Sequence, residues 1–171
     1  MINNFINWAG GLDLLVNNAS SFYPTPVGTI TDNQWHDLMG TNLKGPLFIT
    51  QAATNALKEA KGSVINLIDI HTRSPLKNHP IYGSAKAGLK MLTRSLAKDL
   101  APEIRVNGIS PGAILWPEDG MTDDIKKDIL NKIPLHRIGS PQDIADCVLF
   151  LLYKADYITG QIIAVDGGRS V

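Results

Sequence analysis

Four short apolar segments alternate along the chain with longer segments of helical periodicity, and no other feature constrains the fold as strongly. The first of them, LDLLVNNA, is of the kind that is buried on both faces of a sheet. The apolar segments cover residues 12–19, 63–69, 104–111 and 160–168. The helical segments cover residues 5–11, 31–62, 81–102 and 140–155. This order predicts an α/β fold with a parallel sheet and right-handed crossovers.

Capping residues define the ends of the predicted helices. Thr31 is suited to N-cap the long second helix, and Gly62 to stop it. Ser140 is suited to N-cap the last helix, with Pro141 at its first position. The polar, proline-flanked stretch 113–140 predicts a mobile flap rather than a boundary between domains.

Length and composition are those of an ordinary globular domain. We expect residues 1–171 to form one domain, since 44% of them are apolar and 19% charged. Sixteen basic and sixteen acidic residues balance, so the sequence predicts no binding of nucleic acid or of an anionic membrane. No run of 18 apolar residues and no signal peptide is visible. Cys147 in its apolar helical segment predicts a buried, reduced thiol, which is typical of the cytoplasm.

Tyr82 and Lys86 lie four positions apart at a helix start and therefore share one face. An ammonium about 4 Å from a phenol, at an effective dielectric constant near 20, favours the phenolate by about 4 kcal/mol. We therefore expect Lys86 to lower the pKa of Tyr82 toward that of a useful general acid. The alternative is a surface tyrosine beside a solvated lysine, which such a spacing alone usually represents.

Polar residues follow the ends of three predicted strands, where open parallel sheets bind their ligands. Asn18, Asp69 and Gly112 hold these positions, and Tyr82 begins the helix after one of them. Asp69 could instead cap the turn that follows it. Asn42 is a poor helix former in the middle of a predicted helix, and its amide could simply bond to the backbone.

Five motifs in order resemble the short-chain dehydrogenase/reductase family. They are LDLLVNNAS, TNLKGP, YGSAK, IRVNGISPG and YITGQIIAVDGG, and the resemblance runs from Leu12 to Val171. It implies a Rossmann-like, doubly wound parallel sheet. It also implies that Tyr82 is the catalytic acid, that Lys86 lowers its pKa and holds the nicotinamide ribose, and that Asn42 anchors a proton relay. The residues that the resemblance places at the cofactor are Asn18, Ala19, Ser20, Tyr82, Lys86, Pro111, Gly112 and Ile114.

One departure from the family pattern narrows the resemblance. Family members usually carry a serine thirteen positions before the catalytic tyrosine, and this chain has Asp69 there. A carboxylic acid can deliver a proton to a ring nitrogen, whereas a hydroxyl is better suited to hold a carbonyl oxygen. Asp69, the stretch NNASSFYPTP and the terminal DGGRS together resemble the pteridine reductases.

That narrower resemblance implies reduction of a biopterin- or folate-like ring by NADPH. Asp69 and Tyr82 would then protonate ring nitrogens, and Ser20 would touch both pterin and cofactor. Phe22 would stack on the pterin. The residues implied as substrate contacts are Ser20, Phe22, Asp69, Leu76, Tyr82 and Trp116. For Phe22 and Trp116 the alternative is simple packing in a hydrophobic loop.

No glycine-rich dinucleotide motif occurs in the chain. The resemblance therefore covers only the C-terminal part of the family fold, without the N-terminal strands that carry this loop. NADPH rather than NADH follows from the resemblance alone. The segment 12–19 is then expected to be an exposed apolar edge, and the chain to be a fragment or to bury that edge against another copy.

Two alternatives to a pterin reductase stand. One is a reductase of carbonyl groups in the same family, and the other is a catalytically silent fragment that serves as an oligomerisation module. The family resemblance implies a homo-oligomer, a dimer or tetramer packed through residues 31–61 and 82–101. The four histidines show no metal-ligand spacing, so no metal site is predicted. They are His36, His71, His79 and His136.

Overall fold

A single four-stranded parallel sheet organises the computed structural model, which describes residues 2–116 and 122–171. Its elements in chain order are α1 (Ile2–Ala9), β1 (Leu14–Asn17), α2 (Asp32–Met39), a π-helical segment (Gly40–Lys44), α3 (Gly45–Ala60), β2 (Ser63–Leu67), a short 3-10 helix (Ile70–Thr72), α4 (Pro80–Asp99), β3 (Arg105–Pro111), α5 (Asp123–Asn131), α6 (Pro141–Tyr153) and β4 (Ile162–Val165).

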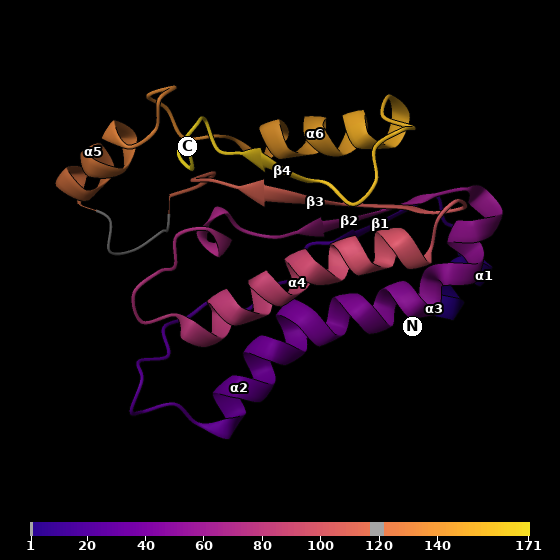
Figure 1. Cartoon of the computed structure of the whole chain (residues 1–171), viewed down its shortest axis with the longest axis horizontal. Coiled ribbons are helices and arrows are strands. Elements are labelled where there is room, and N and C mark those ends of the chain that lie inside the picture. Colours follow the sequence, from indigo (N-terminus) through magenta and orange to yellow (C-terminus); the bar gives the residue numbers. More distant parts are fainter. Residues whose placement is uncertain (1, 117–121) are drawn as a thin grey trace.

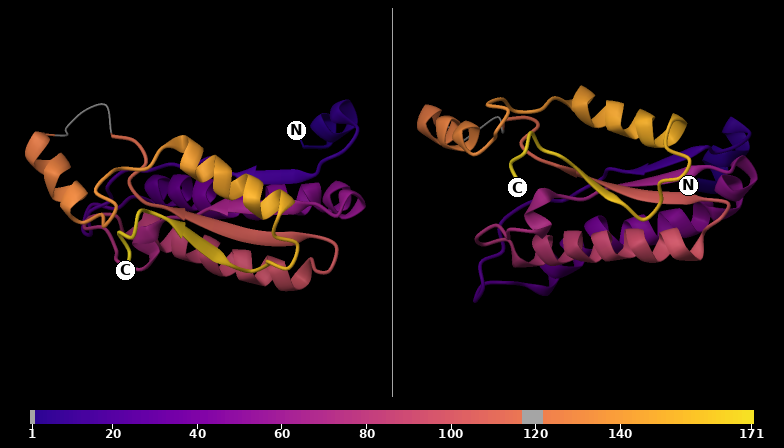
Figure 2. Two further views of the ribbon diagram at one scale, coloured as in Figure 1. Left: turned by 90° about the horizontal axis from the view of Figure 1, so that it is seen from above. Right: turned by 45° about the horizontal axis from the view of Figure 1, so that its top comes forward.

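The strands follow one another in space as they do in sequence, in the order β1-β2-β3-β4, and every neighbouring pair is parallel. Helices α3 and α4 cover one face of the sheet and α6 covers the other, while α5 lies beyond the carboxyl ends of the strands (Figures 1 and 2). The predicted α/β, Rossmann-like parallel sheet is therefore confirmed.

Alternate residues of the strands contribute their side chains to two separate hydrophobic clusters, one on each face of the sheet. Val64 and Val106 point to the side of α3 and α4, where they pack with Ala53 and Leu57. Ile65, Leu67 and Ile109 point to the other side, where they pack with Leu151 of α6. A strand that supplies both clusters is buried on both faces, and β2 is buried at every position, with Ser63 and Asn66 as its two polar residues.

The helix caps agree with the sequence at most ends. Thr31 and Ser140 form capping boxes with Gln34 and Asp143. The prediction that Gly62 stops the long helix is wrong in detail, because Lys61 adopts the left-handed conformation, with φ of 50°. The glycine is needed for space, since a Cβ added at Gly62 would lie 2.5 Å from the carbonyl oxygen of Asp13.

The helix predicted over residues 31–61 is interrupted by the π-helical segment Gly40–Lys44.

Cys147 is only half-buried. Its thiol is free, packs beside the cluster under α6, and has a pKa raised by that burial. β1 is the edge strand, and its Val16 is 38% exposed. Among the described residues no helix is both long and apolar enough to span a membrane.

Buried amides link the strands to the helices beneath them. The Asn17 side chain donates to Asn66 Oδ1 at 2.8 Å and to Thr50 Oγ1 at 3.3 Å. The Asn66 side chain donates in turn to Thr93 Oγ1 at 2.9 Å. These bonds connect α3, β1, β2 and α4 close to the carboxyl end of the sheet. They satisfy polar groups that would otherwise be costly to bury.

We expect Asn66→Ala to lower the free energy of unfolding by about 2–3 kcal/mol, because it removes one hydrogen bond from each of two buried partners, on β1 and α4. Urea denaturation followed by circular dichroism measures the change. Asn55→Ala, at an exposed position of α3, is the matched control and should stay within about 0.5 kcal/mol. Equal stability of the two variants would contradict this role of Asn66.

Candidate active site

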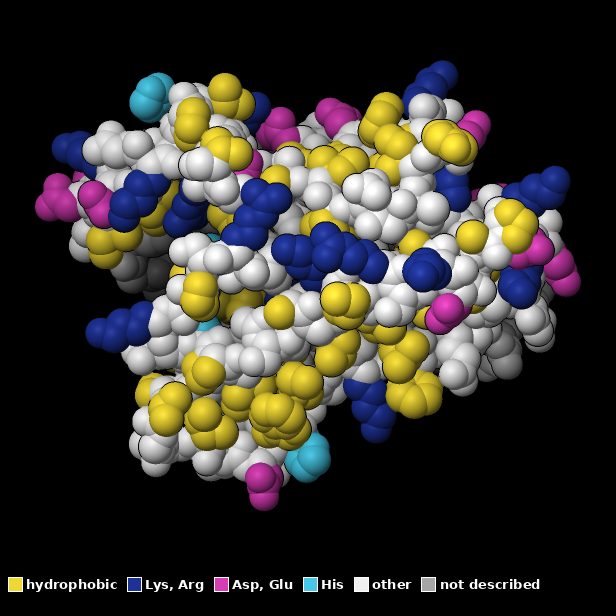
Figure 3. Space-filling view, in the orientation of Figure 1, with side chains coloured by type: hydrophobic (Ala, Val, Ile, Leu, Met, Phe, Trp, Pro, Cys, Tyr) yellow, Lys and Arg dark blue, Asp and Glu magenta, His cyan; other side chains and the backbone are white. Residues whose placement is uncertain are grey.

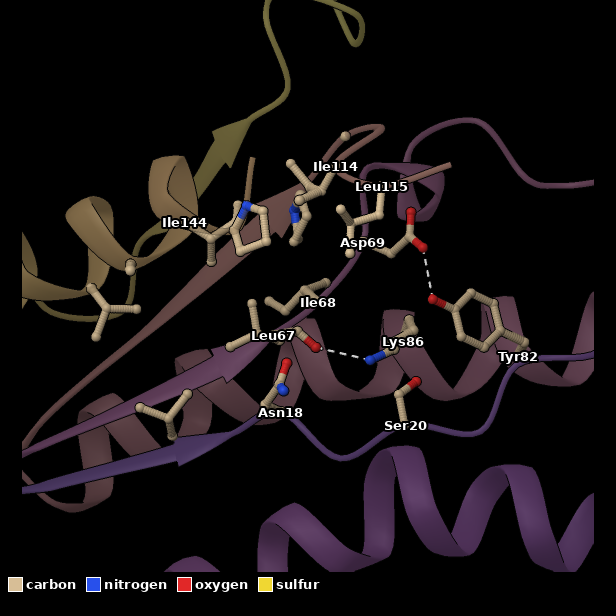
Figure 4. A pocket seen from close by; sticks show the side chains of 16 residues that line it. Asn18, Ser20, Leu67, Ile68, Asp69, Tyr82, Lys86, Ile114, Leu115 and Ile144 are labelled. Carbon is tan, nitrogen blue, oxygen red and sulfur yellow. Dashed lines mark hydrogen bonds between the residues drawn. The ribbon is translucent and has the colours of Figure 1, made fainter. Parts of the chain in front are cut away.

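The carboxyl ends of β1, β2 and β3 open into one cavity of about 850 Å³. Asn18 and Asp69 follow the first two strands, and Pro111 and Gly112 end and follow the third. Parallel register brings these segments to the same edge of the sheet, where Tyr82 and Lys86 of α4 face them (Figure 4). Eight of the residues that the sequence places at the site line this cavity: Asn18, Ser20, Asp69, Tyr82, Lys86, Pro111, Gly112 and Ile114.

Asp69 is the hub of the hydrogen bonds in the site. The Tyr82 hydroxyl donates to Asp69 Oδ2 at 2.7 Å. The backbone N–H of His71 donates to Asp69 Oδ1 at 2.7 Å, and His71 Nδ1 lies 2.7 Å from that same oxygen. Asp69 therefore both caps the short 3-10 helix and faces the tyrosine. The turn role and the site role, which the sequence offered as alternatives, occur together.

The pKa of Asp69 lies below its ordinary value. Burial alone would raise this pKa, but the hydrogen bonds from the ring and backbone of His71 and from Tyr82 outweigh burial, because they stabilise the charged form. Asp69 is therefore a carboxylate at neutral pH.

The pKa of Tyr82 is raised well above its ordinary value, first by burial and then by the charge of Asp69 and the hydrogen bond to it. The expectation that Lys86 lowers this pKa is wrong for the present arrangement. The Lys86 ammonium lies 5.8 Å from the centre of the Tyr82 ring, whereas the carboxylate touches the hydroxyl directly. The nearer negative charge dominates.

Lys86 is only 4% exposed, and its Nζ donates to the carbonyl oxygen of Leu67 at 2.9 Å. Burial lowers its pKa to about 8, although the charge of Asp69 acts in the opposite direction. One hydrogen bond leaves two ammonium donors for a ligand in the cavity.

Asn42 does not line the cavity but supports it from behind. It is completely buried in the π-helical segment, and its Nδ2 donates to the carbonyl oxygens of Leu38 and Ser21 at 2.9 Å each. Its Oδ1 accepts from the Ser20 hydroxyl at 2.6 Å. Asn42 thus fixes the loop that carries Ser20 into the site.

The other expected contacts lie around the cavity rather than in its wall. The Phe22 ring is 57% exposed, stacks on His79 and meets the edge of Tyr82, with ring centres 4.8 Å apart in both pairs. Leu76 lines a second cavity of about 640 Å³, and Trp116 is half-buried outside the lining of either cavity. Ala19 is exposed and does not line the first cavity.

His71 contacts Asp69 through both its backbone N–H and its ring, and the sequence did not predict this contact. The usable signal was its place two residues after a strand-terminal aspartate, in the pattern Asp-Ile-His. This spacing suits a turn in which the aspartate accepts from the residue two positions on.

The residues present fit the nicotinamide and ribose end of a dinucleotide. Tyr82 and Lys86 offer donors on one side, and Ile114, Ile144 and Val148 offer an apolar wall on the other. Gly112 at the rim lets the chain after β4 pack closely against it, since a Cβ there would lie 2.7 Å from the Asp166 Cα. The sequence holds no glycine-rich turn for a pyrophosphate.

Comparisons with known proteins find relatives that match nearly the whole chain. A family model described as enoyl-(acyl carrier protein) reductase matches residues 1–170. Pteridine reductase 1 of Leishmania tarentolae is 38% identical over a match of 191 residues, gaps included. The match covers 98% of this chain and 65% of that protein. A 3-oxoacyl-[acyl-carrier-protein] reductase, FabG, of Staphylococcus aureus strain Mu50 is 39% identical over 172 residues, covering 98% and 70%. The chain thus spans about two thirds of the length of these relatives.

A solved structure has the same fold. The crystal structure of a protein described as a short-chain alcohol dehydrogenase from Sinorhizobium meliloti 1021 superposes with a TM-score of 0.92 at 35% identity. The match covers 98% of this chain and 69% of that one.

We expect Asp69→Asn to lower the pKa of Tyr82 relative to the unsubstituted protein, because the substitution removes the negative charge next to the hydroxyl. Ultraviolet difference titration measures tyrosine ionisation, and subtraction of a Tyr82→Phe variant isolates this residue. Circular dichroism at each pH confirms that the protein stays folded. If Tyr82 ionises at the same pH with and without the carboxylate, the electrostatic account of the site is wrong.

Proposed function

The chain belongs to the short-chain dehydrogenase/reductase family, and from this membership we propose that it reduces a pterin ring with NADPH. Family members are NAD(P)H-dependent oxidoreductases. The observation that carries the pterin proposal is the carboxylate of Asp69, which shares a 2.7 Å hydrogen bond with Tyr82 in the cavity. The similarity to a pteridine reductase supports it.

A pterin requires protons at nitrogen atoms. When bound, the nicotinamide cofactor supplies hydride to a ring carbon, and a nitrogen must take up a proton. Asp69 and Tyr82 present two oxygen atoms that can hold such protons side by side. Phe22 lies beside Tyr82 and can stack on an aromatic substrate with the face that His79 leaves free.

Lys86 and Ser20 have positioning roles in this proposal. The free donors of Lys86 point into the cavity and can hold the ribose of the cofactor. Ser20 is held by Asn42 and lines the same cavity, so it can contact both ligands. NADPH rather than NADH rests on the similarity to pteridine reductase.

Reduction of a carbonyl is the second candidate, because the 3-oxoacyl reductase relative is as similar in identity as the pterin reductase. The mostly apolar wall of the cavity, with Leu67, Ile114 and Ile144, also suits an acyl chain. In that reaction Tyr82 alone would protonate the carbonyl oxygen, and Asp69 would have no direct role.

Self-association is part of the proposal. Trp35, Phe48 and Met91 are between 47% and 59% exposed, and they lie on α2, α3 and α4. Figure 3 shows hydrophobic side chains gathered over the region where α2 lies in Figure 1. An exposed apolar patch of this kind marks an interaction surface, and a second copy of the chain would cover it.

Asp69→Ser distinguishes the two candidate substrates. With a dihydropterin we expect kcat/KM to fall at least about 100-fold, because the acid facing the ring nitrogen is lost. With a 3-oxoacyl thioester the same variant should keep most of its activity. Tyr82→Phe is the control and should lower both activities. Retention of pterin reduction by the serine variant would exclude the proposed role of Asp69.

Binding must be measured apart from turnover. Titration of tryptophan fluorescence with NADPH, with and without a dihydropterin, tests whether the folded chain holds the cofactor. A folded chain that binds neither ligand would favour the catalytically silent alternative.

A further inference from the structure

We propose that His71 is a proton-relay residue, which carries protons from the second cavity to Asp69 and through it to the substrate. The inference rests on the proposed function, because it supplies the proton that Asp69 would pass on. The geometry is a continuous chain: His71 Nδ1 lies 2.7 Å from Asp69 Oδ1, and Asp69 Oδ2 accepts from the Tyr82 hydroxyl at 2.7 Å.

The site needs a further proton donor, because neither Asp69 nor Tyr82 readily gives up a proton. Three hydrogen bonds hold Asp69 in its charged form, so at neutral pH it has no proton of its own to give. Tyr82, with its raised pKa, keeps its proton tightly. A donor to nitrogen in this site must therefore be reloaded from a third group. The His71 ring is the proton-carrying side chain in contact with Asp69 on the side away from Tyr82.

His71 also connects the first cavity with the second. Asp69 and Tyr82 line the first cavity, whereas His71 lines the second, together with Thr72 and Leu76. The side chains of His71 and Asp69 are 23% and 19% exposed, and His71 is exposed toward the second cavity. Protons can thus reach Asp69 from solvent through the second cavity while ligands fill the first.

The transfer balances without an additional reactant. A protonated imidazole carries hydrogen on both ring nitrogens. It gives the Nδ1 proton to Asp69 Oδ1 and becomes neutral. The carboxyl group formed in this way then gives that proton to the substrate nitrogen and returns to a carboxylate. Between turnovers the ring regains a proton from water. Histidine is suited to this exchange near neutral pH.

Other titratable groups face the relay and belong to any pH profile of it. Asp69 is the direct partner, His79 at the start of α4 lines the same second cavity, and Lys86 on α4 is subject to the charge of Asp69. Arg73 lies two residues further along the same turn.

A purely structural role for His71 makes a different prediction. The His71 backbone N–H holds Asp69 whatever side chain is present. In His71→Asn, the side-chain amide can donate where Nδ1 lies but cannot carry a proton. His71→Ala loses both properties. If the ring only orients Asp69, the asparagine variant should restore activity; if it relays protons, the variant should behave like alanine.

The experiment measures kcat and KM for a dihydropterin across pH in the full chain, in His71→Ala and in His71→Asn. We expect both variants to lose about tenfold or more in kcat with little change in KM, and free imidazole to rescue His71→Ala. His136→Asn is the matched control at an exposed position with φ of 51°, where asparagine is well tolerated. Wild-type kcat in His71→Asn would overturn the relay.

A second measurement does not depend on turnover. Nitrogen-15 spectra of the histidine rings, assigned with His71→Asn, report which ring nitrogen carries the proton. We expect hydrogen at Nδ1 of His71, and loss of this preference in Asp69→Asn. A bare Nδ1 facing Asp69 would overturn the relay even if the chain reduces no pterin. An Nδ1–H in a protein without turnover would instead overturn the proposed function alone.

Discussion

The parallel register of the sheet is the constraint on which the site depends. Asn17 pairs with Asn66, and Asn66 with Gly108. The carboxyl ends of β1, β2 and β3 therefore lie at the same edge of the sheet. The same two asparagines bond to each other and to the helices below. A shift of one residue would turn every strand side chain to the opposite face. The same shift would break the hydrogen bonds of the buried amides and move Asp69 away from Tyr82.

Within that frame a single carboxylate sets the electrostatics of the cavity. A serine in place of Asp69 could donate to a carbonyl but could not hold a charge at neutral pH. The carboxylate instead accepts from Tyr82, raises the pKa of that tyrosine and opposes the lowering of the Lys86 pKa by burial. One substitution in a family pattern thus changes the protonation behaviour of both its neighbours. The ionic state of the site follows from Asp69 more than from the Tyr–Lys pair.

Sequence reasoning was sufficient where the signal is local or periodic. Apolar runs located the four strands, and the caps at Thr31 and Ser140 follow from side chains that reach three residues along the chain. It placed Asp69, Tyr82 and Lys86 in one cavity because the carboxyl ends of parallel strands meet. It failed for the π-helical segment, since buried Asn42 bonds to a loop twenty-one residues before it. It also failed for the pKa of Tyr82, because spacing alone does not show that the carboxylate is nearer than the ammonium.

The Tyr82–Asp69 hydrogen bond also bears on the choice of substrate. A carbonyl oxygen that enters the cavity must take the proton that Tyr82 now donates to Asp69, and so must compete with a charged acceptor at 2.7 Å. A pterin presents both an acceptor and ring N–H donors, so it can engage the tyrosine and the carboxylate at the same time. The substrate then replaces the internal bond with two new ones, whereas a carbonyl would leave Asp69 Oδ2 without the Tyr82 donor, although His71 still holds Oδ1. Since a partly buried polar atom without a partner is costly, a ligand with donor and acceptor side by side suits this pair better.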